Sequence, residues 1–408
     1  MNFWWILYII DGFLFAFVAL TVFYFLVFSI ASLFKRRNEP KKAKEQNRFI
    51  VLIPSYKQGK AVRQTVNSIL GQSYPQRMFD VVVISDHEDE LTNMQLAQMP
   101  ITLLTPNFDK SSKAKSLQYA ILNLPKFKIY DAVLILDAGN IVRSEYLEEV
   151  NDAYASSGTK AIQTHRLSAN RDTSAARLDS IFEEINNAIF RRGHQVLGLS
   201  AALNGSGIIF DFQWFKTNIM KIRSTVGEDK ELESLLIRNN IFVDYFEDIH
   251  VYDEKTRSIK EFNDQRSRWI YTQLHAAFGN LRYLPHAILN RNHDLIDKIL
   301  QWLLIPRTIL VGIIAMMSII LPFIYMTLAL KWWIIGTVIL FAFSLATPNY
   351  LVDKNWDKDF IRAPLVSIGG LFNIFRAGHS EATYRANAIS KWIGRLRKKD
   401  KKKKKKNR

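Results

Sequence analysis

The sequence of 408 residues contains no cysteine. A disulfide framework and any thiolate metal site are therefore excluded, because both require cysteine sulfur. The eight histidines show no H-E-x-x-H pattern or other paired ligand spacing. The first predicted strand, 49–56, is not followed by a glycine-rich phosphate loop, so a Rossmann or P-loop nucleotide site is not indicated.

Positive charge is concentrated at one end of the chain. The net charge is +17, and residues 391–408 hold twelve Lys or Arg and one Asp, so eleven of these charges lie in the tail. The body is therefore not basic enough to indicate a nucleic-acid-binding protein. Six consecutive lysines, 401–406, repel one another, which predicts either a solvated, disordered tail or attraction to anionic lipid headgroups.

Long uncharged segments predict membrane helices. Residues 12–34 and 308–330 are long enough to cross a bilayer, and 332–349 form a shorter third segment beyond Lys331. The basic run after the first segment, "KRR", puts the N-terminus outside and the following domain in the cytoplasm, as expected in an inner (plasma) membrane. Residues 350–390 mix aromatic and charged residues, which favours an interfacial segment.

The middle of the chain alternates predicted strands and helices. The strands 49–56, 79–86 and 132–136 are almost wholly apolar, and helical periodicity lies between them. This alternation indicates an α/β domain with parallel strands and helices on both faces of the sheet. Asp86 and Asp137 follow two of these strands, so both are predicted at the edge where open α/β sheets bind ligands.

Four parts of the chain follow from these patterns. We expect an N-terminal membrane helix with a basic linker, a cytoplasmic domain, a membrane hairpin, and an interfacial segment with a lysine-rich tail. Their predicted boundaries are 1–46, 47–296, 297–350 and 351–408.

Five motifs resemble glycosyltransferase family 2, in particular its membrane-embedded polysaccharide synthases of the cellulose, hyaluronan, chitin and poly-N-acetylglucosamine type. They occur in the family's order between residues 47 and 275: "VLIPSYKQ", "VVVISDHEDE", "SKAKSLQYA", "GEDKELE" and "QRSRW". The last is the most specific, since it fits the Gln-x-x-Arg-Trp signature in full. The resemblance implies a GT-A type mixed sheet, and transfer of a sugar from a nucleotide-sugar donor with inversion at the anomeric carbon.

The resemblance also implies roles for particular residues. Asp229 corresponds to the catalytic base, and its neighbour Glu228 could raise its affinity for a proton. Residues that would contact the nucleotide are Asp86, Lys113, Asp137, Gln265 and Arg268; residues that would contact the acceptor are Trp269, Gly205 and Gly207.

A departure from the family pattern concerns the metal. The stretch "LDAGN" stands where the family usually has Asp-Ala-Asp, so Gly139 replaces the second acid. Asp137 would be the acidic ligand for Mg²⁺ or Mn²⁺, and Asn140 could supply a neutral oxygen. Mg²⁺ often uses one or two protein carboxylates together with substrate phosphates, so a weak, nucleotide-dependent site is the expectation.

Three functions remain open from the sequence. The first is a chain-extending transferase that makes a polysaccharide, and the second adds a single sugar to a lipid carrier. The third is a degenerate, non-catalytic assembly subunit, which the loss of the second acid would explain. Expected partners are a nucleotide-sugar donor, a polysaccharide or lipid-linked acceptor, and membrane lipids. Three spans are few for a channel, so a homo-oligomer or an export partner is also expected.

Overall fold

The computed structural model describes residues 3–34, 40–125, 127–223 and 227–351. The predicted interfacial segment beyond residue 351, the lysine tail and the basic run at 35–37 therefore lie outside the described residues.

An eight-stranded mixed sheet forms the centre of the globular domain, in the order β3-β2-β1-β4-β7-β6-β8-β5. β1 runs parallel to β2 and β4, whereas β7 is antiparallel to β4 and β6, and β5 is antiparallel to β8. The predicted α/β class and mixed sheet are confirmed. The strands are β1 (Phe49–Tyr56), β2 (Phe79–Asp86), β3 (Thr102–Leu104), β4 (Ala132–Ile135), β5 (Ile141–Val142), β6 (Ala161–Ser168), β7 (Ile208–Asp211) and β8 (Val243–Asp253).

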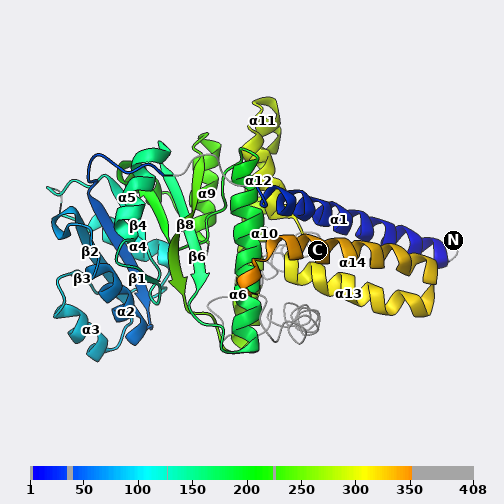
Figure 1. The fold of residues 1–408 in the computed structure, drawn as a ribbon, viewed down its shortest axis with the longest axis horizontal. Helices are drawn as coiled ribbons and strands as arrows, with labels where there is room; N and C mark the ends of the chain where they lie inside the picture. Colours follow the sequence, from blue (N-terminus) through cyan, green and yellow to red (C-terminus); the bar gives the residue numbers. More distant parts are fainter. Residues whose placement is uncertain (1–2, 35–39, 126, 224–226, 352–408) are drawn as a thin grey trace, which may run out of the picture.

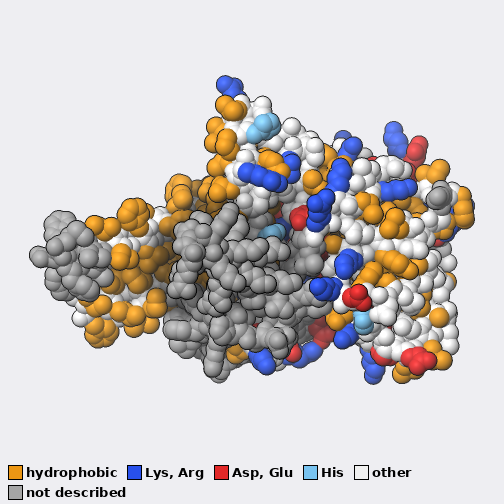
Figure 2. Space-filling view, turned by 180° about the vertical axis from the view of Figure 1, so that it is seen from behind, with side chains coloured by type: hydrophobic (Ala, Val, Ile, Leu, Met, Phe, Trp, Pro, Cys, Tyr) orange, Lys and Arg blue, Asp and Glu red, His pale blue; other side chains and the backbone are white. Residues whose placement is uncertain are grey.

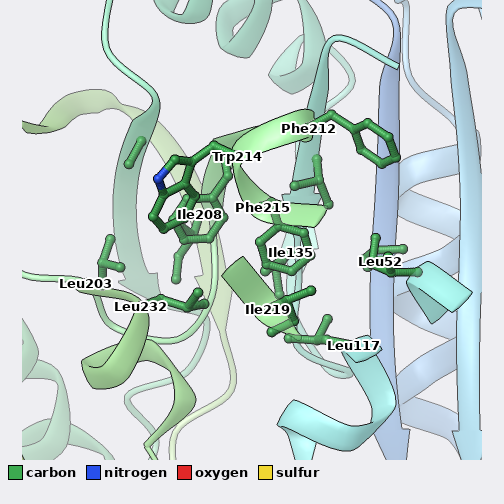
Figure 3. Packing of buried hydrophobic residues seen from close by; sticks show 14 of the residues in the cluster. Leu52, Leu117, Ile135, Leu203, Ile208, Phe212, Trp214, Phe215, Ile219 and Leu232 are labelled. Carbon is green, nitrogen blue, oxygen red and sulfur yellow. The ribbon is translucent and has the colours of Figure 1, made fainter. Parts of the chain in front are cut away.

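Helices cover both faces of the sheet, because its central strands are apolar on both sides. One core lies under α4, α8 and α9, and Figure 3 shows Phe215 and Ile219 of α8 beside Ile135 and Leu117. The other core lies under α2, α3 and α5. These helices are α2 (Lys60–Leu70), α3 (Glu90–Ala97), α4 (Lys113–Leu122), α5 (Tyr146–Ser157), α8 (Phe212–Ile219) and α9 (Glu228–Arg238). Each fully buried large apolar side chain contributes roughly 1.5–3 kcal/mol.

Three helices project from this domain side by side (Figure 1): α1 (Phe3–Ala31), α13 (Arg307–Ile324) and α14 (Met326–Ala346). All three are long and apolar enough to cross a membrane, which confirms the predicted number of spans. Figure 2 shows hydrophobic side chains gathered along them.

The predicted boundary between the last two spans was wrong. The helices separate at Tyr325, which is extended, rather than at Lys331. Lys331 lies inside α14 because its ammonium pairs with the buried carboxylate of Asp11 on α1. Asp11 also accepts a hydrogen bond of 2.8 Å from Trp332 Nε1. A charged residue is tolerated at such a position when it is paired in this way.

Further helices connect the domain to the spans. α6 (Ser174–Asn187) continues through a π-helical turn, Ala188–Gly193, into α7 (His194–Val196). Gly193 lies so close to α1 that a Cβ atom would be 2.4 Å from the Phe28 carbonyl oxygen. α10 (Ile259–Asn280) stands between the sheet and the spans in Figure 1. Beyond it, α11 (Leu284–Leu289) leads to α12 (His293–Leu303), which packs on α10 and is followed by α13.

A topological prediction follows from this connectivity and from the positive-inside pattern. Reporter fusions placed after residues 45 and 290 are both expected to read as cytoplasmic, because α1 precedes the first position and the hairpin follows the second. Paired phosphatase and fluorescent-protein reporters measure this. An extracytoplasmic signal at either position would contradict the predicted orientation.

Candidate active site

A cavity of about 480 Å³ lies where the sheet domain meets α10 and the start of α13. Eight of the eleven residues predicted for the site line it: Lys113, Asp137, Gly205, Glu228, Asp229, Gln265, Arg268 and Trp269. They come from segments more than 150 residues apart along the chain, so folding brings the predicted motifs to one place.

Lys113 occupies the centre of a charged cluster. It is the first residue of α4, whose N-cap Ser112 accepts a hydrogen bond from the Lys115 amide. Its ammonium contacts the carboxylate of Asp137 and donates to the Gly205 carbonyl oxygen at 2.5 Å. Burial opposes the charge on Lys113, but the carboxylates of Asp137 and Glu228 outweigh it and raise its pKa. Gly205 has φ +88°, which turns its carbonyl toward this lysine.

Two acids open α9 beside this lysine. Glu228 lies 3.7 Å from Lys113 Nζ, measured from Oε1. Burial, together with repulsion from Asp229, raises the pKa of Glu228 to about 7 against the opposing effect of Lys113. Burial and the charge of Glu233 also raise the pKa of Asp229, although Lys230 opposes this. A carboxylate whose affinity for a proton is raised in this way is suited to general base catalysis.

The turn before these acids is fixed by a close contact. Gly227 has φ +84°, and a Cβ atom there would lie 2.1 Å from Thr272 Cγ2 of α10. Further along α9, the buried Glu233 binds Lys230 at 2.8 Å and Lys298 of α12 at 3.1 Å. These contacts hold the start of α9 against α10 and α12.

α10 presents the "QRSRW" motif to the cavity. Arg268 is exposed and, among the described residues, forms no ion pair or hydrogen bond through its side chain. The Trp269 ring packs under the guanidinium of Arg266 at 4.4 Å from its centroid. The buried Gln265 Oε1 atom has no hydrogen-bond partner. Arg268 can therefore bind an anion, while Gln265 and Trp269 offer a hydrogen-bond acceptor and an aromatic surface.

Three predicted residues do not line the cavity. Asp86 ends β2 as expected, but its buried carboxylate lies 2.6 Å from His87 Nδ1. Asn140 is fully buried; its oxygen accepts from Ser206, and its nitrogen donates to Asp253 at 2.8 Å. In this arrangement the Asn140 oxygen is not directed toward a metal. Gly207 has φ +64° and packs against Thr164 and Val251 rather than facing the cavity.

Gly207→Ala is expected to destabilise the domain by about 1–3 kcal/mol. The added Cβ would lie 2.4 Å from Thr164 Oγ1 and would sit on a left-handed backbone. Thermal unfolding of the purified protein measures this loss. Gly158→Ala is the control, because it shares a positive φ of +66° but has no atom within 4 Å of the added Cβ. Equal losses in both variants would assign the effect to backbone strain alone.

The structure gives a backbone reason for Gly139. Its φ is +100°, which other residues rarely adopt, and its amide donates to Thr65 Oγ1 at 2.8 Å. The second acid is thus replaced by a residue that the turn requires. The described residues contain no group of three His, Asp or Glu able to hold a metal ion. Asp137 alone fits a cation only when donor phosphates complete the coordination.

Sequence reasoning missed several charged residues around the cavity. Arg166, Glu183 and Arg191 line it, and Arg166 pairs with Asp253 at 2.5 Å. Burial opposes ionisation of Glu183, but Lys255, followed by the nearby arginines, lowers its pKa well below its usual range. These residues stand on β6, α6 and the π-helical turn, outside any recognisable motif. Arg266 also lines the cavity and, unlike these three residues, stands inside a recognisable motif, "QRSRW".

The mixed sheet with helices on both faces fits a GT-A type fold, and the cavity beside it gathers residues from the predicted motifs. The model of the family described as "Glycosyltransferase like family 2" matches residues 46–272. The chain therefore belongs to this family and is a nucleotide-sugar-dependent glycosyltransferase.

A solved glycosyltransferase structure shares the fold at low sequence identity. The mannosyltransferase PcManGT from Pyrobaculum calidifontis, in complex with GDP-Man and Mn²⁺, is 15% identical with a TM-score of 0.52; the match covers 80% of this chain and 97% of that one. S. aureus TarS 1–349 in complex with UDP-GlcNAc is 15% identical with a TM-score of 0.42, covering 82% and 93%. Comparison with curated proteins found no significant match.

Proposed function

We propose that this protein transfers a sugar, with inversion, from a nucleotide-sugar donor to a growing polysaccharide at a membrane surface. The observation that carries the proposal is one continuous cavity. It is lined by the acids Glu228 and Asp229, by the cations Lys113 and Arg268, and by Phe25 of the membrane helix α1. The residues proposed to act on the donor and a residue of a membrane helix thus line the same cavity.

Asp229 acts as the base in this proposal. It accepts the proton of an acceptor hydroxyl as that oxygen attacks the anomeric carbon, opposite the departing nucleoside diphosphate. The bond to the diphosphate breaks as the new glycosidic bond forms, so the configuration inverts. A diphosphate leaves without protonation, and one base is therefore sufficient, unlike the two carboxylates of a glycosidase.

Cations stabilise the leaving group. Arg268 has no partner among the described residues and can bind phosphate oxygens, while Lys113 adds a second positive charge at the cavity wall. A Mg²⁺ or Mn²⁺ held by Asp137 and the donor's diphosphate would supply further charge neutralisation. The solved complexes of the similar structures contain GDP-Man with Mn²⁺ in one case and UDP-GlcNAc in another, so both nucleotide classes are candidate donors.

A second candidate function is transfer of one sugar to a lipid carrier. The observation that favours it is the apolar lining at the membrane end of the cavity, formed by Phe25, Leu304 and Ile305. The length of the product separates the two. A ladder of products from one lipid-linked acceptor supports polysaccharide synthesis, whereas a single added sugar supports the second candidate.

The direct test is a screen of nucleotide sugars with the full chain purified in detergent. We expect one donor to release nucleotide in the presence of membrane lipid extract, and Asp229→Asn to lose this release. If no donor is bound or consumed, the third possibility, a non-catalytic assembly subunit, is favoured. We place the protein in an inner (plasma) membrane with its catalytic domain in the cytoplasm, where nucleotide sugars are made.

A further inference from the structure

Arg307 is a cation of the cavity wall that lacks a carboxylate partner among the described residues. It is the first residue of α13 and lines the cavity at the point where the membrane span begins. Its guanidinium donates 2.8 Å to the Phe182 carbonyl oxygen and lies 5.5 Å from the Phe182 ring centroid. Neither contact neutralises its charge.

The neighbouring arginines are already paired. Arg266 contacts Asp179, and Arg191 lies 3.7 Å from Glu183. Arg266 is nevertheless incompletely satisfied: the residue is 7% exposed, and its buried Nε–H has no hydrogen-bond partner. The guanidinium groups of Arg266 and Arg307 thus lie beside the same Phe182 ring, and both residues line the cavity.

The N-terminus of α13 adds backbone donors at this place. The N-cap is Pro306, which has no polar side chain, and no side chain caps this 18-residue helix. Pro306, Arg307 and Thr308 all line the cavity. Gln273 of α10 fixes the preceding turn by donating to the carbonyl oxygens of Trp302 and Leu304 at 3.1 and 2.9 Å. An uncapped helix N-terminus beside an unpaired arginine is suited to bind a phosphate.

The residues around Arg307 indicate that a ligand would enter this end of the cavity from the membrane side. Phe25, Leu304 and Ile305 make this end of the cavity apolar and belong to a membrane helix or the segment leading into one. The donor cluster of Lys113 and Asp137 lies instead at the sheet edge. Trp269, the predicted acceptor residue, packs on Arg266 and so lies beside the Arg307 end.

We propose that Arg307, Arg266 and the N-terminus of α13 form a subsite for the phosphate of a lipid-linked acceptor. The lipid lies toward the membrane helices, and the sugar attached to the phosphate extends past Trp269 toward Asp229. This inference rests on the proposed transferase function and names the chemical class of its acceptor.

Binding to the full chain in a non-ionic detergent tests the subsite. The probes are farnesyl phosphate, farnesol and inorganic phosphate, measured by thermophoresis. The wild type is expected to bind farnesyl phosphate at least tenfold more tightly than either of the others. Arg307→Gln should weaken farnesyl phosphate binding by about 10- to 100-fold, because a charged hydrogen bond is lost, while farnesol binding stays unchanged. Arg307→Lys should retain part of the affinity.

Arg282→Gln is the matched control, because Arg282 is an exposed arginine that does not line the cavity. It should bind farnesyl phosphate as the wild type does. The subsite is refuted if farnesol binds as tightly as farnesyl phosphate, or if Arg282→Gln has the same effect as Arg307→Gln.

Nucleotide binding, measured on the same samples with UDP and GDP, separates the two proposals. Normal nucleotide affinity without preference for farnesyl phosphate overturns the subsite alone, whereas absence of nucleotide binding overturns the proposed transferase function. If Arg307→Gln weakens nucleotide binding as much as farnesyl phosphate binding, Arg307 belongs to the donor site and the acceptor assignment is wrong.

Discussion

Replacing Asp229 with asparagine is expected to lower sugar transfer by roughly 100-fold or more, the effect typical of losing a positioned proton acceptor. Asparagine keeps the size of the side chain but cannot take the proton of the acceptor hydroxyl. Because Asp229 lines the cavity at the start of α9 without contacting Lys113 directly, the donor cluster should remain intact. Steady-state transfer and nucleotide affinity are the two measurements.

Glu231→Gln is the control for this experiment. Glu231 lies in the same first turn of α9 but does not line the cavity, so a loss of helix-dipole stabilisation would affect both variants alike. A comparable fall in transfer and in nucleotide affinity for Asp229→Asn would show that the acid supports the structure of α9 and is not the base.

The raised pKa values of these acids predict opposite pH effects on activity and stability. Transfer requires an unprotonated base, so it should rise with pH as Asp229, whose pKa burial and Glu233 raise, loses its proton. Glu228 beside it has a pKa of about 7 because of burial and repulsion from Asp229. A buried acid with a raised pKa binds its proton more tightly in the folded state than in the unfolded state. Its contribution to stability is therefore greatest below its unfolded pKa and is lost as pH rises toward 7. Glu228→Gln should remove this pH-dependent loss, which unfolding measured from pH 5 to 8 can detect.

Local motifs predicted the residues of this site better than they predicted its surroundings. Lys113, Asp229 and Arg268 each stand in a short motif, and the order of the motifs implied that one fold would bring them together. Arg307 and Glu183 carry no such signal, because only the folding of the whole chain brings α6 and the start of α13 to the cavity. A sequence read segment by segment cannot show these long-range contacts.

In the sheet and in the membrane spans, too, local features were predictable from the sequence and long-range contacts were not. The buried strands at 49–56 and 79–86 were predictable from their continuous apolar runs. The antiparallel insertion of β7 between β4 and β6 was not, since pairing partners are not encoded in local periodicity. An isolated lysine is unfavourable in a membrane, so Lys331 predicts a break between spans. Its partner Asp11 lies 320 residues away in the chain and makes the position tolerable.

The largest expected effect on a ligand is that of Asp137→Ala on metal binding. In the wild type we expect Mn²⁺ to bind weakly alone and more tightly with a nucleoside diphosphate, because Asp137 is the one acid of "LDAGN" and must share the cation with phosphate oxygens. The ammonium of Lys113 already contacts the Asp137 carboxylate, so a cation must also displace or share this contact. Asp137→Ala should abolish the nucleotide-dependent binding. Titration of free Mn²⁺ by electron paramagnetic resonance, with and without GDP or UDP, measures it.

Gly139→Asp distinguishes a missing ligand from a required turn. If the glycine were merely a lost acid, the substitution would restore a ligand and tighten Mn²⁺ binding. Because φ is +100° at this position, an aspartate should instead cost about 1–2 kcal/mol of stability and leave metal affinity unimproved. Asp109→Ala, an exposed acid outside the cavity, is the control for charge. If Asp137→Ala binds Mn²⁺ and consumes donor as the wild type does, Asp137 is not the metal ligand, and the proposed metal site at "LDAGN" is wrong.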